Sequence, residues 1–123
     1  MVRLGDLERR VMDVLWTAYG TELTGRDVAA HLDGYAYTTV LTVLSRLEKK
    51  GLVRHERTGS QHHFAAVATR ETYIADLMHD ALDVGSDRDA ALVRFAASVS
   101  PTEAAVLRRA LDQVVSSGDA PVR

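Results

Sequence analysis

The sequence contains no cysteine, which excludes disulfides, iron–sulfur clusters, thiolate zinc sites and a cysteine nucleophile. It also lacks any run that approaches the roughly 18 apolar residues of a membrane-spanning helix. The N-terminus has no apolar stretch of the signal-peptide type and becomes acidic at Asp6. With 46% hydrophobic residues the chain is expected to be globular. We therefore expect a cytoplasmic protein without membrane insertion and without a cofactor.

The charge is nearly balanced, with a formal net charge of -2 over 123 residues, but it is unevenly distributed. Residues 36–63 contain five basic and two acidic side chains, so their net charge is +3. Residues 69–123 contain six basic and nine acidic side chains, so their net charge is -3. The basic segment fits either a solvated face or a surface that contacts phosphate, and its place in the fold decides between them.

Hydrophobic spacing in the first half predicts three helices and a β-hairpin, with helices at about 6–18, 25–32 and 37–50 and strands at 52–57 and 61–67. Asp6 is the expected N-cap of the first helix, and Thr24 with Asp27 is expected to form a capping box for the second. The hairpin register stays open, because the turn fits a loop of two or of three residues.

The last part of the chain predicts three further helices, at 70–83, at 87–98 and from Pro101 onward, followed by a frayed tail at 116–123. These helices carry more apolar residues than one short chain can cover. The predicted fold is therefore mainly α with a small β-hairpin: a winged helix-turn-helix over residues 1–68 and a helical dimerisation region over residues 69–123.

The helix at 37–50 has one apolar face and an opposite face suited to DNA. Hydroxyl groups can donate or accept at base edges, and an arginine can bind guanine through two hydrogen bonds. Lysines can neutralise phosphates. Three helices followed by a hairpin is the order of a winged helix-turn-helix, in which the second helix of the turn enters the major groove. The candidate DNA-binding residues of this helix and the hairpin are Thr38, Thr39, Leu41, Thr42, Ser45, Arg46, Lys49, Lys50, Arg54, Arg57 and His62.

Two motifs carry a resemblance to the penicillinase repressors (the BlaI/MecI/CopY family). The run Y-T-T-V-L-T-V-L-S-R-L-E-K-K-G-L-V at 37–53 is similar to their T-V-x-T-L-L-x-R-L-x-K-K-G motif. The segment 7–16, with Glu8, Val11, Met12 and Trp16, resembles their E-x-x-V-M-x-x-W start. The resemblance continues at 91–95, covers roughly residues 4–115, and is strongest to actinobacterial members.

The resemblance implies a homodimeric repressor that binds a palindromic operator of the TACA/TGTA type and controls genes of the β-lactam-resistance type. It implies dimer contacts through the C-terminal helices, for which the candidate residues are Leu77, Leu82, Leu92, Phe95, Leu107, Leu111 and Val114. Some of these residues are expected to pack within their own chain instead.

The resemblance also implies inactivation by cleavage, triggered by a membrane sensor-protease. The matching bond is Arg94–Phe95, where staphylococcal members carry Asn at the first position. Leu41 similarly stands where some staphylococcal members carry Arg. Copper-responsive relatives use a C-terminal cysteine motif that this chain lacks.

Other functions have less support. The sequence has no phosphate loop, no GxSxG and no HExxH motif, so no enzyme is expected. His62 and His63 are adjacent on a strand and point to opposite faces, so no metal site is expected, although His55 could lie across the hairpin from one of them. Two alternatives remain open: a winged helix that binds protein rather than DNA, and a ligand-responsive regulator of another winged-helix family.

Overall fold

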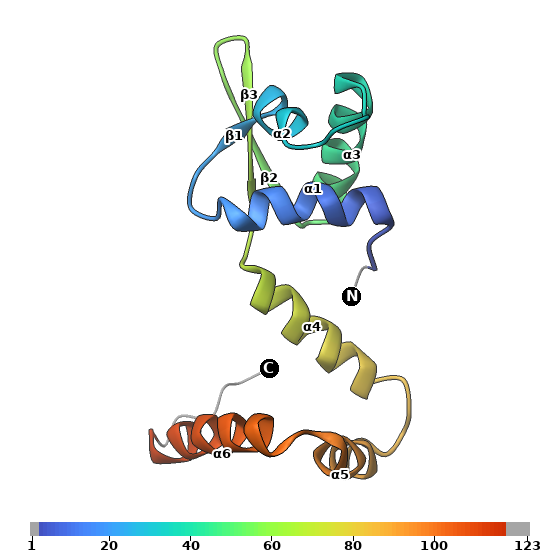
Figure 1. The fold of residues 1–123 in the computed structure, drawn as a ribbon, viewed down its shortest axis with the longest axis vertical. Helices are drawn as coiled ribbons and strands as arrows, with labels where there is room; N and C mark the ends of the chain where they lie inside the picture. Colours follow the sequence, from blue (N-terminus) through green and yellow to red (C-terminus); the bar gives the residue numbers. More distant parts are fainter. Residues whose placement is uncertain (1–2, 118–123) are drawn as a thin grey trace. The chain divides into compact units, whose positions relative to one another are not determined.

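The structure is a computed structural model that describes residues 3–117 (Figure 1). The chain divides into two compact units, the first ending at Asp80 and the second beginning at Ala81. The predicted fold class is confirmed: the described residues form six helices and one small antiparallel sheet with the element order of a winged helix-turn-helix. None of the helices in the described part of the chain is both long and apolar enough to cross a membrane.

The first unit contains three helices, a three-stranded sheet and the greater part of a fourth helix. In chain order the elements are α1 (Asp6–Thr17), β1 (Leu23–Thr24), α2 (Gly25–Ala30), α3 (Tyr37–Lys49), β2 (Val53–Thr58), β3 (Gln61–Ala66) and α4 (Arg70–Leu82). The strand order is β1-β3-β2, so β1 extends the hairpin on the β3 side. Sequence reasoning missed β1, because a strand of two residues shows no alternation of apolar and polar positions.

The hairpin has a two-residue loop, which settles the register that the sequence left open. Thr58 pairs with Gln61, and the turn passes through Gly59 at φ 63°. A positive φ of this kind suits glycine, which has no Cβ to clash with the backbone. In this register His55 lies opposite Phe64, and both side chains belong to the face of the sheet that carries the buried Val53.

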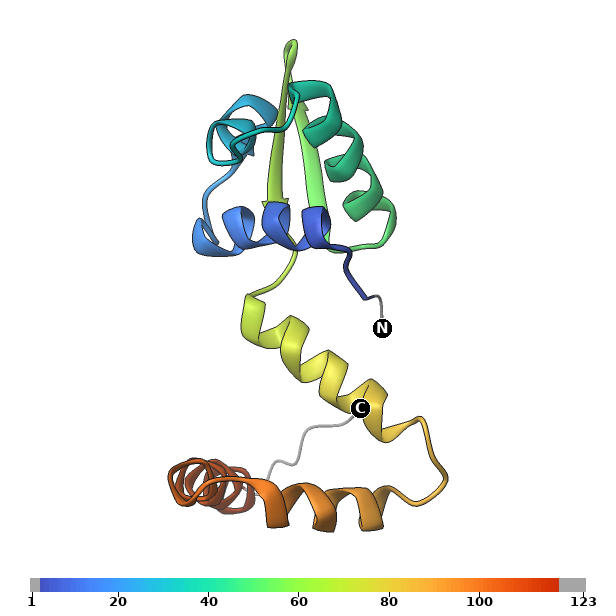
Figure 2. The ribbon, with the colours of Figure 1, turned by 45° about the vertical axis from the view of Figure 1, so that its right-hand side comes forward.

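The core of the first unit lies between the sheet and the three N-terminal helices. Its fully buried side chains come from the apolar positions that the 3.6-residue period predicts: Val11, Met12, Leu15, Val28, Val40, Leu44 and Leu47. In Figure 2, α1 runs across the base of the hairpin while α2 and α3 flank it on either side.

The beginning of α4 belongs to this core. Tyr73 is buried, and its ring centroid lies 5.2 Å from that of Trp16 on α1. Leu77, one of the candidate dimer residues, also packs against the buried cluster of its own chain. The compact unit therefore continues beyond residue 68, the predicted end of the winged helix.

The structure corrects the predicted N-cap of α1 and confirms that of α2. The cap of α1 is Gly5 and not Asp6, because the Glu8 side chain reaches back and its Oε1 accepts a hydrogen bond from the Gly5 N–H at 2.9 Å. The capping box of Thr24 and Asp27 is confirmed, with reciprocal hydrogen bonds of 3.0 and 3.1 Å.

The second unit contains α5 (Arg88–Ser98) and α6 (Pro101–Ser116). Ser100 and Glu103 form the predicted capping box of α6, with Pro101 in its first turn. No residue of either helix is buried, although both carry large apolar side chains. Of the tail expected to fray, residues 118–123 lie outside the described part of the chain, and α6 continues as a helix to Ser116.

Candidate nucleic-acid interface

The exposed face of α3 presents most of the predicted DNA-binding side chains. Thr38, Thr39, Thr42, Ser45, Arg46 and Lys49 are all exposed, while the apolar side of the same helix is buried in the core. The Thr42 hydroxyl donates to the carbonyl oxygen of Thr38 at 3.0 Å, which holds its side chain in one orientation and leaves its lone pairs free to accept. This face can therefore offer hydroxyls, a methyl group and two cations to a ligand.

The tip of the β2–β3 hairpin lies toward the same end of the first unit as the start of α3. Figures 1 and 2 both show the turn and the N-terminal half of α3 at the end away from α1. Arg57 is exposed near this tip, where its Nε donates to the carbonyl oxygen of Gly59 at 2.9 Å. The hairpin and α3 thus present basic side chains on neighbouring elements.

Lys50, predicted to contact phosphate, has a different contact in the structure. Its Nζ lies 2.6 Å from Oε2 of Glu8 on α1, and the two side chains are 32% and 13% exposed. This hydrogen bond, together with the one from the Gly5 N–H, lowers the pKa of Glu8 below its ordinary value. Lys50 therefore joins the end of α3 to α1 through a partly buried ion pair.

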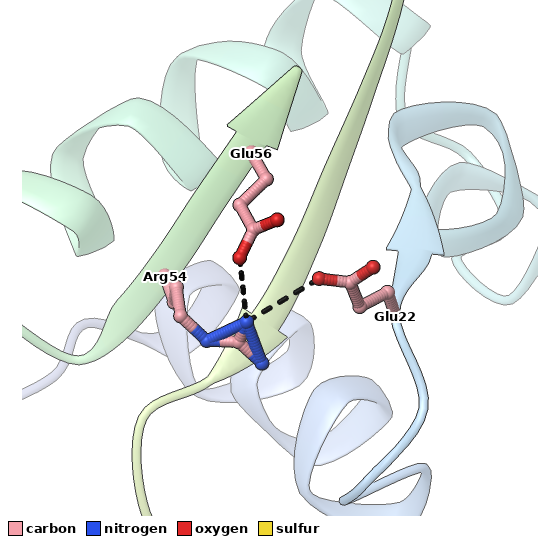
Figure 3. A network of polar contacts seen from close by, with 3 residues as sticks. All are labelled: Glu22, Arg54 and Glu56. Carbon is pink, nitrogen blue, oxygen red and sulfur yellow. Dashed lines mark hydrogen bonds and ion pairs between the residues drawn. The ribbon is translucent and has the colours of Figure 1, made fainter. Parts of the chain in front are cut away.

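Arg54 is also engaged within the protein. Its Nη1 lies 3.3 Å from Oε2 of Glu22 and 3.2 Å from Oε1 of Glu56, and Figure 3 shows it between the two carboxylates. Glu22 directly precedes β1, so it reaches Arg54 only because β1 joins the sheet beside β3. The positive charge of Arg54 is thus balanced by two acidic neighbours.

Leu41, predicted to flank the DNA-binding face, is only partly exposed and packs against the core. The reason is the close approach of α2 to α3. A Cβ placed on Gly25 would lie 2.7 Å from Cδ2 of Leu41 and 3.2 Å from Cε1 of Tyr37. The side chain of Leu41 fills the space that this glycine leaves open between the two helices.

His62 lies against His55, as its position across the hairpin allowed. The Nε2 of His55 and the Nδ1 of His62 are 2.6 Å apart, and the His55 ring stacks on Phe64 at a centroid distance of 4.7 Å. The Nδ1 of His55 faces Oε1 of Glu48 on α3 at 3.5 Å. Within residues 3–117 no group of three metal-ligating side chains is arranged to hold an ion.

Sequence reasoning missed Arg26 and Tyr37. The guanidinium carbon of Arg26 on α2 lies 4.6 Å from the ring centroid of Tyr37, the first residue of α3. No spacing pattern in the sequence predicts this contact, because the turn between α2 and α3 brings the two residues together. The exposed basic residues near α3 and the hairpin tip that have no carboxylate partner among the described residues are Arg26, Arg46, Lys49 and Arg57.

Comparison with known proteins gives a consistent family assignment. The family model described as penicillinase repressor matches residues 4–113. The transcriptional regulator BlaI of Mycobacterium tuberculosis, found in two strains, is 47% identical over 120 residues, which cover 93% of this chain and 86% of that protein.

Solved structures show the same fold at low sequence identity. A mutant of Staphylococcus aureus MepR bound to an oligodeoxyribonucleotide has a TM-score of 0.51 and 17% identity, over 93% of this chain and 79% of that chain. Another MepR mutant, from a multidrug-resistant S. aureus clinical isolate, has the same TM-score and identity, over 93% and 78%.

Proposed function

We propose that this chain, which belongs to the penicillinase repressor family, is a homodimeric transcriptional repressor that binds a palindromic operator through α3 and the β2–β3 hairpin. The observation that carries the proposal is the exposed face of α3, which presents hydroxyl and basic side chains on a helix that packs against the β2–β3 hairpin. Membership of this family also argues against a regulator of another winged-helix family.

In the proposed complex, α3 enters the major groove with its exposed face toward the bases. Thr42 and Ser45 reach base edges, and the threonine methyl can pack against a thymine methyl. Arg46 binds guanine or phosphate, while Lys49 and Arg57 neutralise phosphates on either side. We expect a palindrome of the TACA/TGTA type, upstream of genes of the β-lactam-resistance type.

The second unit supports the proposed dimer. Its two helices leave Leu92, Phe95, Leu107, Leu111 and Val114 between 37% and 61% exposed. Two helices with no buried residue cannot form a stable core by themselves, so a second copy of the same helices is the natural cover for these side chains. A two-fold dimer would place two α3 helices about one DNA turn apart, roughly 34 Å.

We also propose that cutting the Arg94–Phe95 bond releases the repressor from DNA. The bond lies inside α5, so its peptide groups are hydrogen-bonded and must unwind before a protease can bind them as an extended chain. Within one protomer no residue of α5 is buried, so the cost of unwinding it lies mainly in the dimer contacts proposed for Leu92 and Phe95. Separated protomers would bind half-sites singly and lose the avidity of the dimer.

The DNA-binding proposal is tested by selecting bound sequences from random duplex DNA with the full chain. We expect an inverted repeat, and we expect affinity for it to fall steeply with salt because phosphate contacts release counterions. Binding that is indifferent to both sequence and salt would contradict the proposal and favour a winged helix that binds protein.

The cleavage proposal is tested in cells by following the size of the protein during full derepression. We expect a fragment that ends at Arg94, identified by mass spectrometry, and a sensor-protease encoded by a neighbouring gene. Intact protein throughout derepression would contradict proteolytic release, while leaving the DNA-binding proposal untouched.

A further inference from the structure

We propose that Arg26 is a phosphate-contacting residue of the DNA interface and that Tyr37 is the positioning residue that holds it. This inference rests on the proposed DNA binding and adds to it a contact from α2, outside the helix and hairpin that carry the motif. The guanidinium of Arg26 and the aromatic ring of Tyr37 face each other across the α2–α3 turn.

The position of Tyr37 is fixed from two sides. On one side the ring lies against Gly25 and occupies the space that a side chain at this position would fill. A Cβ on Gly25 would lie 3.2 Å from Cε1 and 3.4 Å from the hydroxyl oxygen of Tyr37. On another side the guanidinium of Arg26 lies over the ring face at 4.6 Å. Consecutive residues of α2 therefore hold the first residue of α3.

This contact restricts the position of the Arg26 guanidinium. A guanidinium that lies over an aromatic face keeps the N–H groups at its edge free for hydrogen bonds in its own plane. Arg26 is exposed and has no carboxylate partner among the described residues, in contrast to Arg54, which lies between two glutamates. Its charge and its N–H donors thus remain available to an anion that can accept two hydrogen bonds, such as a phosphate.

The location fits a phosphate on the DNA backbone. Arg26 lies over the first residue of α3, and the next residue, Thr38, opens the exposed hydroxyl face of that helix. In a helix-turn-helix the helix that precedes the recognition helix crosses the sugar-phosphate backbone while the recognition helix enters the groove. A guanidinium fixed over the start of α3 would meet the backbone at the edge of that groove.

The experiment measures binding of the full chain to two labelled duplexes, one with the TACA/TGTA palindrome and one with a scrambled sequence, across a series of salt concentrations. For Arg26→Ala we expect both affinities to fall by about threefold to tenfold and the salt slope to decrease by about 0.9 per protomer. Arg10→Ala is the matched control, since Arg10 is also exposed but lies on α1, away from the hairpin tip.

The role of Tyr37 is tested by replacing its ring. We expect Tyr37→Phe to retain the affinity and the salt slope, because the aromatic face remains. We expect Tyr37→Leu to reproduce the loss of slope seen with Arg26→Ala, and the double variant Arg26→Ala/Tyr37→Leu to lose no more than either single one. Thermal unfolding of each variant separates this effect from a loss of folded protein.

The outcomes distinguish the two proposals. If the wild-type chain binds neither duplex at low salt, the proposed DNA-binding function fails. If the wild-type chain binds but Arg26→Ala keeps the wild-type salt slope, Arg26 does not contact phosphate and this inference is overturned. If Tyr37→Leu keeps the slope while Arg26→Ala loses it, Arg26 binds phosphate without help from the ring, and the positioning role is overturned.

Discussion

Nζ of Lys50 lies 2.6 Å from Oε2 of Glu8, and Glu8 also accepts the N–H of Gly5 through its other oxygen. One carboxylate thereby joins the N-terminus of α1 to the end of α3. Lys50 stands in a motif that reads as DNA-binding, yet this contact makes it part of the support for α3. The position of α3 is thus supported by an ion pair beyond its C-terminal end, on the side of α1.

The first prediction concerns the stability that this contact provides. We expect Glu8→Gln to lower the free energy of unfolding by about 1 kcal/mol at neutral pH, because a partly buried, charge-assisted hydrogen bond is lost. Lys50→Gln should have a similar effect, and the double variant should cost less than the sum of the two. Lys49→Gln, an exposed neighbour without an ion pair among the described residues, is the control. Urea unfolding measures all four variants.

The same contact predicts a pH dependence. The pKa of Glu8 is lowered in the folded chain, first by the hydrogen bond from Lys50 and then by the one from the Gly5 N–H. Its contribution to stability is therefore full above the ordinary pKa of 4.5 and is lost as the pH falls through the lower value of the folded state. The difference in stability between wild type and Glu8→Gln should shrink below about pH 4.5. A constant difference down to about pH 3 would contradict this account.

A third prediction tests the packing of α2 on α3. Gly25→Val should destabilise the first unit by about 1–3 kcal/mol, because its side chain would overlap Leu41 and Tyr37. Leu41→Ala alone should also destabilise, since Leu41 packs on the core. The double variant should lose less stability than the two single variants lose together, because the shorter side chain at position 41 makes room for valine at position 25. Strict additivity in thermal or urea unfolding would show that the two residues do not compete for space.

A fourth prediction tests the exposed face of α3. Thr42→Ala and Arg46→Ala should each weaken binding to the selected operator by about 1–3 kcal/mol in a gel-shift titration, with unchanged stability. Arg46→Lys separates the two roles of this residue. It should keep the affinity if Arg46 binds phosphate, and lose it if Arg46 binds a guanine edge through two hydrogen bonds. Unchanged operator affinity in both alanine variants would refute this face as the one that contacts DNA.

The fifth prediction concerns the proposed dimer. Leu111→Glu, which places a charge among the exposed apolar side chains of α6, should yield a monomer in analytical ultracentrifugation and weaken operator binding strongly. Arg109→Glu is the control, because Arg109 lies two residues before Leu111 and therefore points about 160° away from it around the axis of α6. It changes the charge by more, yet it should leave the dimer intact. A dimer that survives Leu111→Glu would place the interface elsewhere.

The helices could be predicted from sequence because their causes are local. The apolar period of α3 places Val40, Leu44 and Leu47 in the core and turns Thr38, Thr42 and Ser45 outward. The capping boxes at Thr24 and Ser100 need only residues three positions apart. The predicted cap of α1 was wrong because Gly5, which has no capping side chain, is held instead by Glu8.

The sequence by itself determined the six helices and the hairpin, their order, the exposed hydroxyl face of α3 and the family, because periodicity, caps and motifs depend on neighbours along the chain. Only the tertiary structure decided which charges remain free. Lys50 finds its partner 42 residues away, and Arg54 finds one of its two partners, Glu22, 32 residues away, so no local pattern reveals these two contacts. The same folding brings Arg26 over Tyr37 and leaves its charge exposed. The basic residues of segment 36–63 are therefore not the same set as the unpaired basic residues on the surface of the folded unit. The reason is that an ion pair depends on distance in space and not on separation along the chain.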